Sequence, residues 1–307
     1  MTRTHVRDWK ADAALLFVVL VWGFNFPIIK AVLEVMPPHA MNFFRLVFSA
    51  LLLGGFYAAR QRKRGLAFFA PLRAYTGPVL ALGLLGYLVY QVTFIVGINH
   101  TAAGSAALIM ASVPLWSALL GHLFRFERLR GLAWFGLMLT LSGTAAIVLL
   151  GGKEIDFGGA VLFGNLVMLG AAILWGAYTA FNRPVLRHVS PLELTFLGLL
   201  VALPFLFVVA LPEFRAVEWH RLNGWIWLAL LYSGGLSTGL APVLWSASVQ
   251  NVGAAHTAAF GNLVPFIALF SSYVLLGEPI LPAQILGGLL IIGGIVIMRR
   301  GRRPVPS

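Results

Sequence analysis

Apolar stretches about as long as a bilayer is thick, separated by short polar breaks, occupy almost the whole chain of 307 residues. A helix of roughly 20 apolar residues crosses the hydrocarbon core of a membrane. The pattern therefore predicts an all-α membrane protein with ten transmembrane helices and little room for a separate soluble domain. We expect the helices at residues 11–34, 40–59, 75–98, 102–124, 131–150, 157–182, 191–211, 222–249, 254–276 and 281–298.

The apolar pattern contains the same unit twice. At an offset of 151 residues, Val113-Pro114 recurs as Val264-Pro265, Glu127 as Glu278, Gly136 as Gly287 and Gly143 as Gly294. At an offset of 153 residues, Trp22-Gly23 recurs as Trp175-Gly176 and Pro38 as Pro191. We divide the chain into a first five-helix repeat (1–150), an outer linker (151–156) and a second five-helix repeat (157–307). Because five is odd, the second repeat must be inverted, and inverted repeats around a central cavity are typical of secondary transporters.

Charge is scarce and unevenly distributed. Charged residues make up 10% of the chain, hydrophobic residues make up 60%, and the formal net charge is +12. With the predicted spans, 17 of the 22 Lys and Arg residues fall on one side of the membrane and 5 on the other. This asymmetry follows the positive-inside rule, so it places both termini in the cytoplasm and gives no reason to expect a nucleic-acid partner. The stretch 11–33 is too long for a cleavable signal and is predicted to stay as the first span.

The sequence favours no enzymatic chemistry. It has no HExxH, GxSxG or P-loop motif and no cysteine, and we expect neither a cofactor nor a metal site. Its ten acidic residues all fall at span ends or in loops, so the predicted midplane has no carboxylate for acid–base catalysis. Glu127 and Glu278 follow spans four and nine at equivalent positions. We expect each to place a negative charge near the start of the next helix.

Aromatic and neutral polar residues fall near the predicted midplane, where a polar side chain needs a partner or water. On span three, Tyr87, Tyr90, Gln91 and Phe94 lie at helical spacing and share a face. The other candidates for substrate binding are Trp22 and Asn25 on span one, Trp175 and Tyr178 on span six, Trp245 on span eight, and His256 and Asn262 on span nine. The alternative role is packing between helices. We favour packing for Trp22 and Trp175, favour a pocket for the span-three residues, and leave both roles open for His256.

Prolines and basic residues inside the spans are further candidates. Pro114 and Pro265 occupy equivalent positions in spans four and nine, where a proline removes a helix hydrogen bond, and each is either a hinge or a simple kink. Lys30 and Arg45 are the basic residues that lie well inside the outer halves of spans. For Lys30 we expect the ammonium group to extend to the outer interface. The connections 65–75 and 211–222 are predicted to be amphipathic and to lie at the membrane surface.

The paired motifs resemble those of the EamA-type transporters of the drug/metabolite transporter superfamily. They are Trp22-Gly23-Phe24-Asn25-Phe26, Lys30 and Arg45 in the first copy, and Trp175-Gly176, Leu276-Gly277-Glu278-Pro279 and Gln284 in the second. The resemblance implies two inverted five-helix repeats and the export of small metabolites or amino acids, and it is strongest to the YddG-type exporters of aromatic amino acids. The second copy departs from the first, with Tyr178 for Asn25, Arg183 for Lys30 and Gly198 for Arg45. The polar groups of the first copy are therefore not simply duplicated.

The internal repeat, the residues near the predicted midplane and the family resemblance together predict a secondary transporter. We expect it to export amphipathic small metabolites by alternating access. Aromatic or other hydrophobic amino acids are the expected substrates, because aromatic rings stack on substrate rings while neutral polar groups hold the zwitterion. The alternatives are an exporter of other metabolites or drugs, and a membrane scaffold that transports nothing. We expect a monomer to suffice, and we expect the lipid bilayer to be a bacterial inner membrane.

Overall fold

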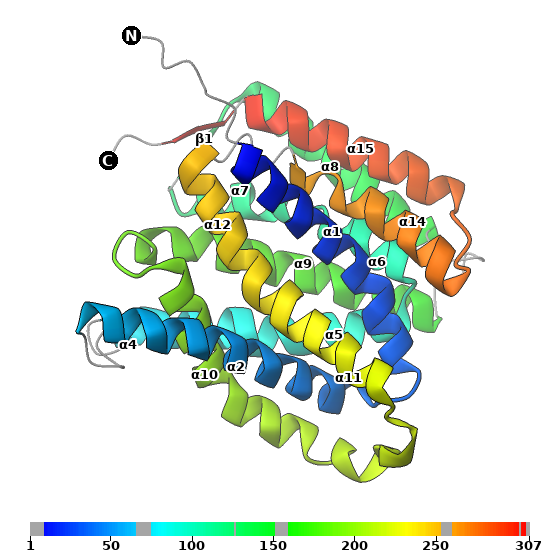
Figure 1. Ribbon diagram of the computed structural model, residues 1–307. Coiled ribbons are helices and arrows are strands. Elements are labelled where there is room, and N and C mark those ends of the chain that lie inside the picture. The colour runs from blue at the N-terminus through cyan, green and yellow to red at the C-terminus, as the bar shows by residue number, and fades with distance from the viewer. Residues whose placement is uncertain are drawn as a thin grey trace.

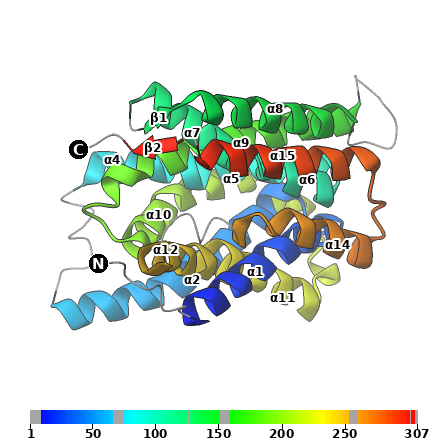
Figure 2. The same ribbon diagram turned by 90° about the horizontal axis from the view of Figure 1, so that it is seen from above.

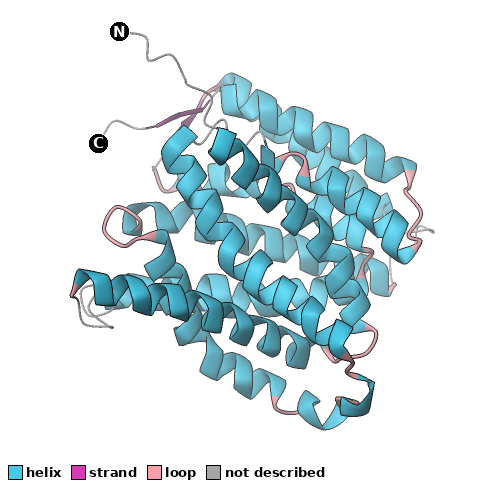
Figure 3. Cartoon of the chain, viewed as in Figure 1, coloured by secondary structure: helices cyan, strands magenta, loops and turns pink. Residues whose placement is uncertain are grey.

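Helices lie side by side through the whole molecule (Figures 1 and 3). The computed structural model describes residues 9–65, 75–125, 127–150, 159–252, 260–300 and 302–304. Within these residues, eight helical segments are long and apolar enough to cross a membrane, and there are two shorter apolar helices. Each apolar stretch predicted from the sequence overlaps one of these segments, so the fold is that of a multi-pass helical protein.

The first half of the chain runs from α1 to α8. Its elements are α1 (Trp9–Leu33), α2 (Pro38–Arg64), α4 (Thr76–Gly83), the π-helix η1 (Leu84–Val89), α5 (Tyr90–His100), α6 (Ala103–Met110), α7 (Val113–Leu123), the short strand β1 (Glu127–Leu129) and α8 (Gly131–Leu150). Only two residues separate α5 from α6, so the two helices form a tight antiparallel hairpin.

The second half runs from α9 to β2. Its elements are α9 (Ala160–Val185), α10 (Pro191–Ala210), the 3₁₀ turns η2 (Glu213–Ala216) and η3 (Trp219–Arg221), α11 (Gly224–Leu231), the π-helix η4 (Tyr232–Leu240), α12 (Ala241–Val252), α14 (Val264–Leu276), α15 (Pro282–Arg300) and the short strand β2 (Arg302–Pro304). Strands β1 and β2 pair antiparallel. The start of α8 and the end of α15 therefore lie at the same end of the bundle, and Figure 1 shows the start of α1 there as well.

Local sequence signals set several helix ends. Pro38 stands in the first turn of α2, where its missing N–H is not needed, and Gly65 ends the helix in the left-handed region with φ 63°. At the start of α10, the Ser190 hydroxyl accepts from the backbone N–H of Glu193 while the Glu193 carboxylate accepts from the backbone N–H of Ser190. This capping box fixes where α10 begins.

The two prolines that we predict to be hinges or kinks, Pro114 and Pro265, each lie where a helix begins. Helix α6 ends at Met110, α7 begins at Val113, and Pro114 is in the first turn of α7. Pro265 has the same place in the first turn of α14. A proline at this position starts a helix without losing a hydrogen bond. Motion about either break remains a prediction.

Two π-helical stretches were not expected from the sequence. They are η1 in the third segment and η4 in the segment that contains α11 and α12. A π-helix holds more residues per turn than an α-helix, so it rotates the faces that follow it, and such stretches often occur at functional sites. Tyr87 lies within η1, whereas Tyr90 and Gln91 follow it, and all three are buried nonetheless.

Of the two longer connections that we predict to lie at the membrane surface, the structure describes only the second in full, residues 211–222. Residues 66–74 lie outside the described part of the chain. In the other connection, the Phe214 ring packs against Phe43 of α2 and Phe207 of α10, with centroid separations of 5.7 and 5.9 Å. The segment is two short 3₁₀ turns tied to α2 and α10, because its aromatic side chains find rings to contact within the protein.

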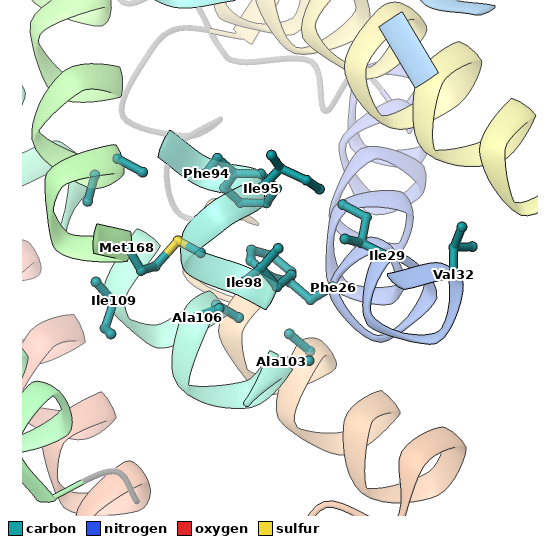
Figure 4. Packing of buried hydrophobic residues seen from close by; sticks show 14 of the residues in the cluster. Phe26, Ile29, Val32, Phe94, Ile95, Ile98, Ala103, Ala106, Ile109 and Met168 are labelled. Carbon is teal, nitrogen blue, oxygen red and sulfur yellow. The ribbon is translucent and has the colours of Figure 1, made fainter. Parts of the chain in front are cut away.

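The core is built where α1, α5, α6 and α9 meet. Figure 4 shows Phe26 and Ile29 of α1, Ile98 of α5 and Met168 of α9 in one cluster of buried side chains. A Cβ atom at Gly97 of α5 would lie 2.9 Å from the backbone nitrogen of Met168, so α5 and α9 approach closely. On one side of this core, α8 and α15 lie together, with α2 and α11 on the opposite side (Figure 2).

Candidate functional site

Five of the predicted site residues form a continuous row of side chains between α5, η1 and α9. Ring centroids are separated by 5.7 Å between Phe94 and Tyr90, 4.6 Å between Tyr90 and Trp175, and 4.8 Å between Trp175 and Tyr178. The row ends at Tyr87, whose hydroxyl oxygen lies 3.3 Å from that of Tyr178. We call these five residues the aromatic row. Sequence analysis favoured simple packing for Trp175, but Trp175 lies at the middle of the row.

Glycines on neighbouring helices leave room for the tyrosines of the row. A Cβ atom at Gly86 would lie 2.5 Å from the Tyr178 ring, and one at Gly198 of α10 would lie 2.9 Å from the Tyr87 ring. A residue larger than glycine at either position would displace a tyrosine. The backbone therefore fixes how the far end of the aromatic row is packed.

Arg45 of α2 lies at the other end of the row. Its guanidinium carbon is 5.6 Å from the centroid of the Phe94 ring, within the range of a cation–π contact. One terminal nitrogen donates to Asn42 Oδ1 at 3.0 Å and to Gln91 Oε1, and the other lies 3.5 Å from Ser233 Oγ. Gln91, predicted to line a pocket, thus belongs to the site by holding Arg45.

Arg45 does not extend toward the membrane surface. Its exposed fraction is 2%, and it reaches Gln91, which is about 14 Å along the helix axis from the end of α5 at 1.5 Å per residue. A charge at such depth costs about 2.5–3.5 kcal/mol or more, so a buried arginine needs a compensating function or partner. Among the described residues, the ion pairs involve other groups, and no carboxylate pairs with Arg45.

Two buried polar atoms of this group have no partner, Arg45 Nε and Asn42 Nδ2. A buried polar group without a hydrogen bond is costly, so a bound polar molecule would stabilise these atoms. Asn25 Oδ1 on α1 is a further buried acceptor without a partner. Arg45, Asn42, Gln91 and Ser233 form what we call the polar end.

The remaining candidates lie elsewhere. Trp22 packs against Trp245 at 5.1 Å between ring centroids and donates its indole N–H to the backbone oxygen of Ser237 at 3.0 Å. This tryptophan pair joins α1 to α12 and η4, which agrees with packing for Trp22. Asn262 is half-buried in the turn before α14. His256 lies outside the described residues.

The aromatic row is closed in this conformation, because its rings pack against one another and all five side chains are largely buried. Two hollows described on the protein lie away from it. One lies between α4, η1 and α9. The other is lined by basic and polar residues near the end of α2 and the start of α10.

Lys30 and Glu278 bind helix ends beside the α5–α6 turn. The Lys30 ammonium donates to the backbone oxygens of Ile98, Asn99 and Thr101 at 3.0, 2.9 and 2.8 Å. The end of α5 offers these carbonyl groups because they have no partner within the helix, and the position of Lys30 relative to the outer interface stays a prediction. We name Lys30, Glu278 and the α5–α6 turn the Lys30–Glu278 clasp.

The Glu278 carboxylate accepts from the backbone N–H groups of Ala103 and Gly104 at 3.0 and 3.2 Å. Glu278 was expected to serve the start of the next helix, α15. It serves the start of α6 instead, since those N–H groups carry the partial positive charge of that helix. The Glu127 side chain lies outside the described residues.

Sequence reasoning underestimated the polar end. Arg45 was noted, but Asn42 and Ser233 were not. The signal available was the spacing of Asn42 and Arg45, which are three residues apart and share a face of α2. The contact of Arg45 with Gln91 joins positions 46 apart and required the fold. Within the described residues there is no group of three or more His, Cys, Asp or Glu side chains placed to hold a metal ion.

Comparison with known proteins gives relatives along the whole length. A "Probable terminal-alkyne amino-acid exporter" of Streptantibioticus cattleyicolor is 30% identical, with 96% of each chain covered. A "Probable amino-acid metabolite efflux pump" of Salmonella typhimurium is 29% identical, with 92% of each chain covered. One solved crystal structure, 21% identical, superposes with a TM-score of 0.64 over 94% of this chain and 95% of that one, and so shares the fold.

The family assignment rests on two matches within one chain. The model of the EamA-like transporter family matches residues 9–149 and again residues 162–300. The two matches cover nearly all of the described helices, including α1, α5 and α9 with the aromatic row. The protein therefore belongs to the EamA-like transporter family of multi-pass membrane proteins.

Proposed function

We propose that the protein is a secondary transporter that exports amino acids with aromatic or other hydrophobic side chains by alternating access. The observation that carries the proposal is the site with two unlike ends, an aromatic row and a buried polar end that meet at Phe94. An amphipathic molecule has the complementary shape, with one apolar and one polar part. The names of the two relatives, which both refer to amino-acid export, agree with it.

The proposed mechanism uses two inverted five-helix repeats, and matched contacts support it. A Cβ atom at Gly23 of α1 would lie 2.7 Å from Ile267 Cβ in α14, and one at Gly176 of α9 would lie 2.5 Å from Trp116 Cβ in α7. Gly176 is the repeat equivalent of Gly23, and Ile267 is that of Trp116. Each repeat thus packs its first helix against the fourth helix of the other, an arrangement that allows one repeat to rock against the other.

In this proposal both termini are cytoplasmic and the chain works as a monomer in a bacterial inner membrane. The breaks at Pro114 and Pro265 act as hinges in the fourth helix of each repeat. The Lys30–Glu278 clasp then lies at the outer end of the bundle. The clasp ties α1, α5 and α6 to Glu278, which lies just beyond α14. This conformation is therefore closed toward the outside.

Counterflow in liposomes tests the function. Purified protein is reconstituted in vesicles loaded with unlabelled solute, and uptake of the labelled solute is followed for phenylalanine, leucine, uracil and a cationic drug. We expect exchange of phenylalanine and leucine, at a rate that falls at least tenfold in Tyr90→Ala. The control is Tyr273→Ala, because Tyr273 is 57% exposed and lies outside the row. Exchange of the drug or uracil alone would favour the alternative substrates, and binding without any exchange would favour a scaffold.

A further inference from the structure

Within the described residues, the Arg45 guanidinium is a buried cation whose hydrogen-bond acceptors are all neutral. Its acceptors are the side-chain oxygens of Asn42, Gln91 and Ser233, and its Nε has no partner. An arginine presents a planar fork of donors that matches a carboxylate in two parallel hydrogen bonds. Neutral amide and hydroxyl oxygens leave the charge itself uncompensated.

The described part of the chain does not supply the missing negative charge. Its acidic residues fall near helix ends or in connections, and none of them lies at the depth of Gln91. Glu34 follows the last residue of α1, Glu193 is in the first turn of α10, and Glu278 is bound to the start of α6. A counter-charge for Arg45 must therefore come from a bound molecule.

The surroundings of Arg45 suit one end of a small molecule. Asn42, which accepts from Arg45, keeps a buried Nδ2 donor without a partner. The Phe94 ring lies under the guanidinium, and the aromatic row continues from it through Tyr90 to Trp175. A carboxylate at Arg45 would thus place an attached apolar side chain along the rings.

We propose that Arg45 is the carboxylate-binding residue of the transport site, so that a carboxylate is required for tight binding. The inference rests on the proposed function, since it names the chemical group that this site recognises. It assigns one carboxylate site to the protein, because the repeat equivalent of Arg45 is Gly198, against which the Tyr87 ring packs. The polar end and the aromatic row therefore bind different parts of one substrate.

Binding to the purified full-length protein is the first test. Thermal stabilisation is titrated with four compounds that share a phenyl ring: phenylalanine and 3-phenylpropionate, which carry a carboxylate, and phenylalaninamide and phenethylamine, which do not. The wild type is expected to bind the carboxylates at least tenfold more tightly. In Arg45→Gln the affinity for the carboxylates should fall by about 10- to 100-fold, the effect of losing charge-assisted hydrogen bonds. Affinity for the amide should change less than threefold.

A second variant neutralises Arg45 without removing it. In Gln91→Glu, a carboxylate of the protein takes the place of the amide that accepts from Arg45, and it competes with the substrate. We expect the same loss of carboxylate binding with a melting temperature equal to or above that of the wild type. This variant keeps the test decisive if Arg45→Gln does not fold. The matched control is Arg215→Gln, which removes an exposed positive charge from η2.

The outcomes separate the inference from the function. The inference is overturned if the wild type binds neither class, or binds both equally, or if Gln91→Glu keeps carboxylate selectivity. Counterflow of phenylalanine is measured on the same proteins. If carboxylate binding depends on Arg45 but no amino acid is exchanged, the carboxylate site stands and amino-acid export is wrong. If phenylalanine and its amide are exchanged alike by the wild type and by Arg45→Gln, export stands and the carboxylate site is wrong.

Discussion

Gly143 of α8 and Gly287 of α15 face each other across a backbone contact. A Cβ atom at Gly143 would lie 2.6 Å from the carbonyl oxygen of Gly287, and one at Gly287 would lie 2.8 Å from the carbonyl oxygen of Gly143. Seven residues away along each helix, Gly136 and Gly294 make the corresponding contact. A Cβ atom at Gly136 would lie 2.5 Å from the carbonyl oxygen of Gly294. Two antiparallel helices are thus held by small residues, a common means of helix association in membranes.

A larger residue at this contact should separate α8 from α15. We expect Gly143→Leu to lower the yield of monodisperse protein severalfold and to cost at least about 1–3 kcal/mol, because the backbones must move apart. Gly293→Ala on the partner helix α15 is the control, since its Cβ atom would meet only Leu139 at 4.0 Å. Size-exclusion profiles and melting temperatures in detergent give the measurement. A Gly143→Leu protein as stable as the control would contradict close packing.

When the Lys30–Glu278 clasp opens, the outer end of the helix bundle should become accessible to water. In Glu278→Gln the charge facing the start of α6 is lost, and we expect a cysteine placed at Ala106, which is buried, to react severalfold faster with a membrane-impermeant maleimide. Lys30→Met should act in the same direction and cost about 1–3 kcal/mol of stability, since three carbonyl groups lose a charged donor.

The control for the clasp is an exposed ion pair nearby. Arg221 lies 3.1 Å from Glu218 at the surface of η3, and exposed pairs contribute little. Arg221→Gln should leave the reactivity of the Ala106→Cys background unchanged. Equal reactivity in Glu278→Gln and in that control would show that the clasp does not hold the closed conformation.

The sequence could predict the positions of the helices because each depends on a long local run of apolar residues. The start of α10 is a further example, since Ser190 and Glu193 form the capping box within four residues. The π-helices η1 and η4 had no such local signal. Gly234 of η4, for example, lies against the backbone of Arg45 in α2. The need for a glycine there comes from the neighbouring helix and not from the sequence of η4 itself.

The site was predictable in part for the same reason. Helical spacing brought Tyr87, Tyr90 and Phe94 into one set, and the structure shows them in one row with Trp175 and Tyr178. Sequence reasoning favoured packing for Trp22 but could not name its partner. Trp22 contacts Trp245, a residue more than 200 positions away, and only the packing of α1 on α12 reveals it. The contact of Arg45 with Gln91 is likewise between residues far apart in the sequence.

Cysteine labelling in whole cells should establish the membrane topology. The distribution of basic residues places the η2 connection outside and the α9–α10 connection inside. We expect Ala216→Cys to react with an impermeant thiol reagent added outside and Arg187→Cys to react only after lysis, since both positions are exposed. The chain has no cysteine of its own, so the background is clean. The reverse pattern would show that the assigned orientation is wrong.

We expect export to be driven by the substrate's own gradient. Proton- and sodium-coupled carriers commonly place a titratable carboxylate or an oxygen-rich ion site at depth. No Asp or Glu in the sequence falls near the middle of a predicted span. The charged group at depth is Arg45, which stays protonated at any physiological pH and cannot carry a proton through the cycle. A transporter with this site needs no coupling ion to move a zwitterion down its gradient.

His256 is the residue that could change this expectation, because imidazole titrates near neutral pH. It lies outside the described residues, on the predicted ninth span. Phenylalanine flux is measured in liposomes with and without an imposed proton gradient, for the wild type and for His256→Gln. We expect equal final distributions in both conditions and no loss of exchange in the variant beyond twofold. Uphill accumulation that follows the proton gradient and disappears in His256→Gln would refute facilitated diffusion and identify the coupling residue, because only a proton bound and released in each cycle can transmit that gradient.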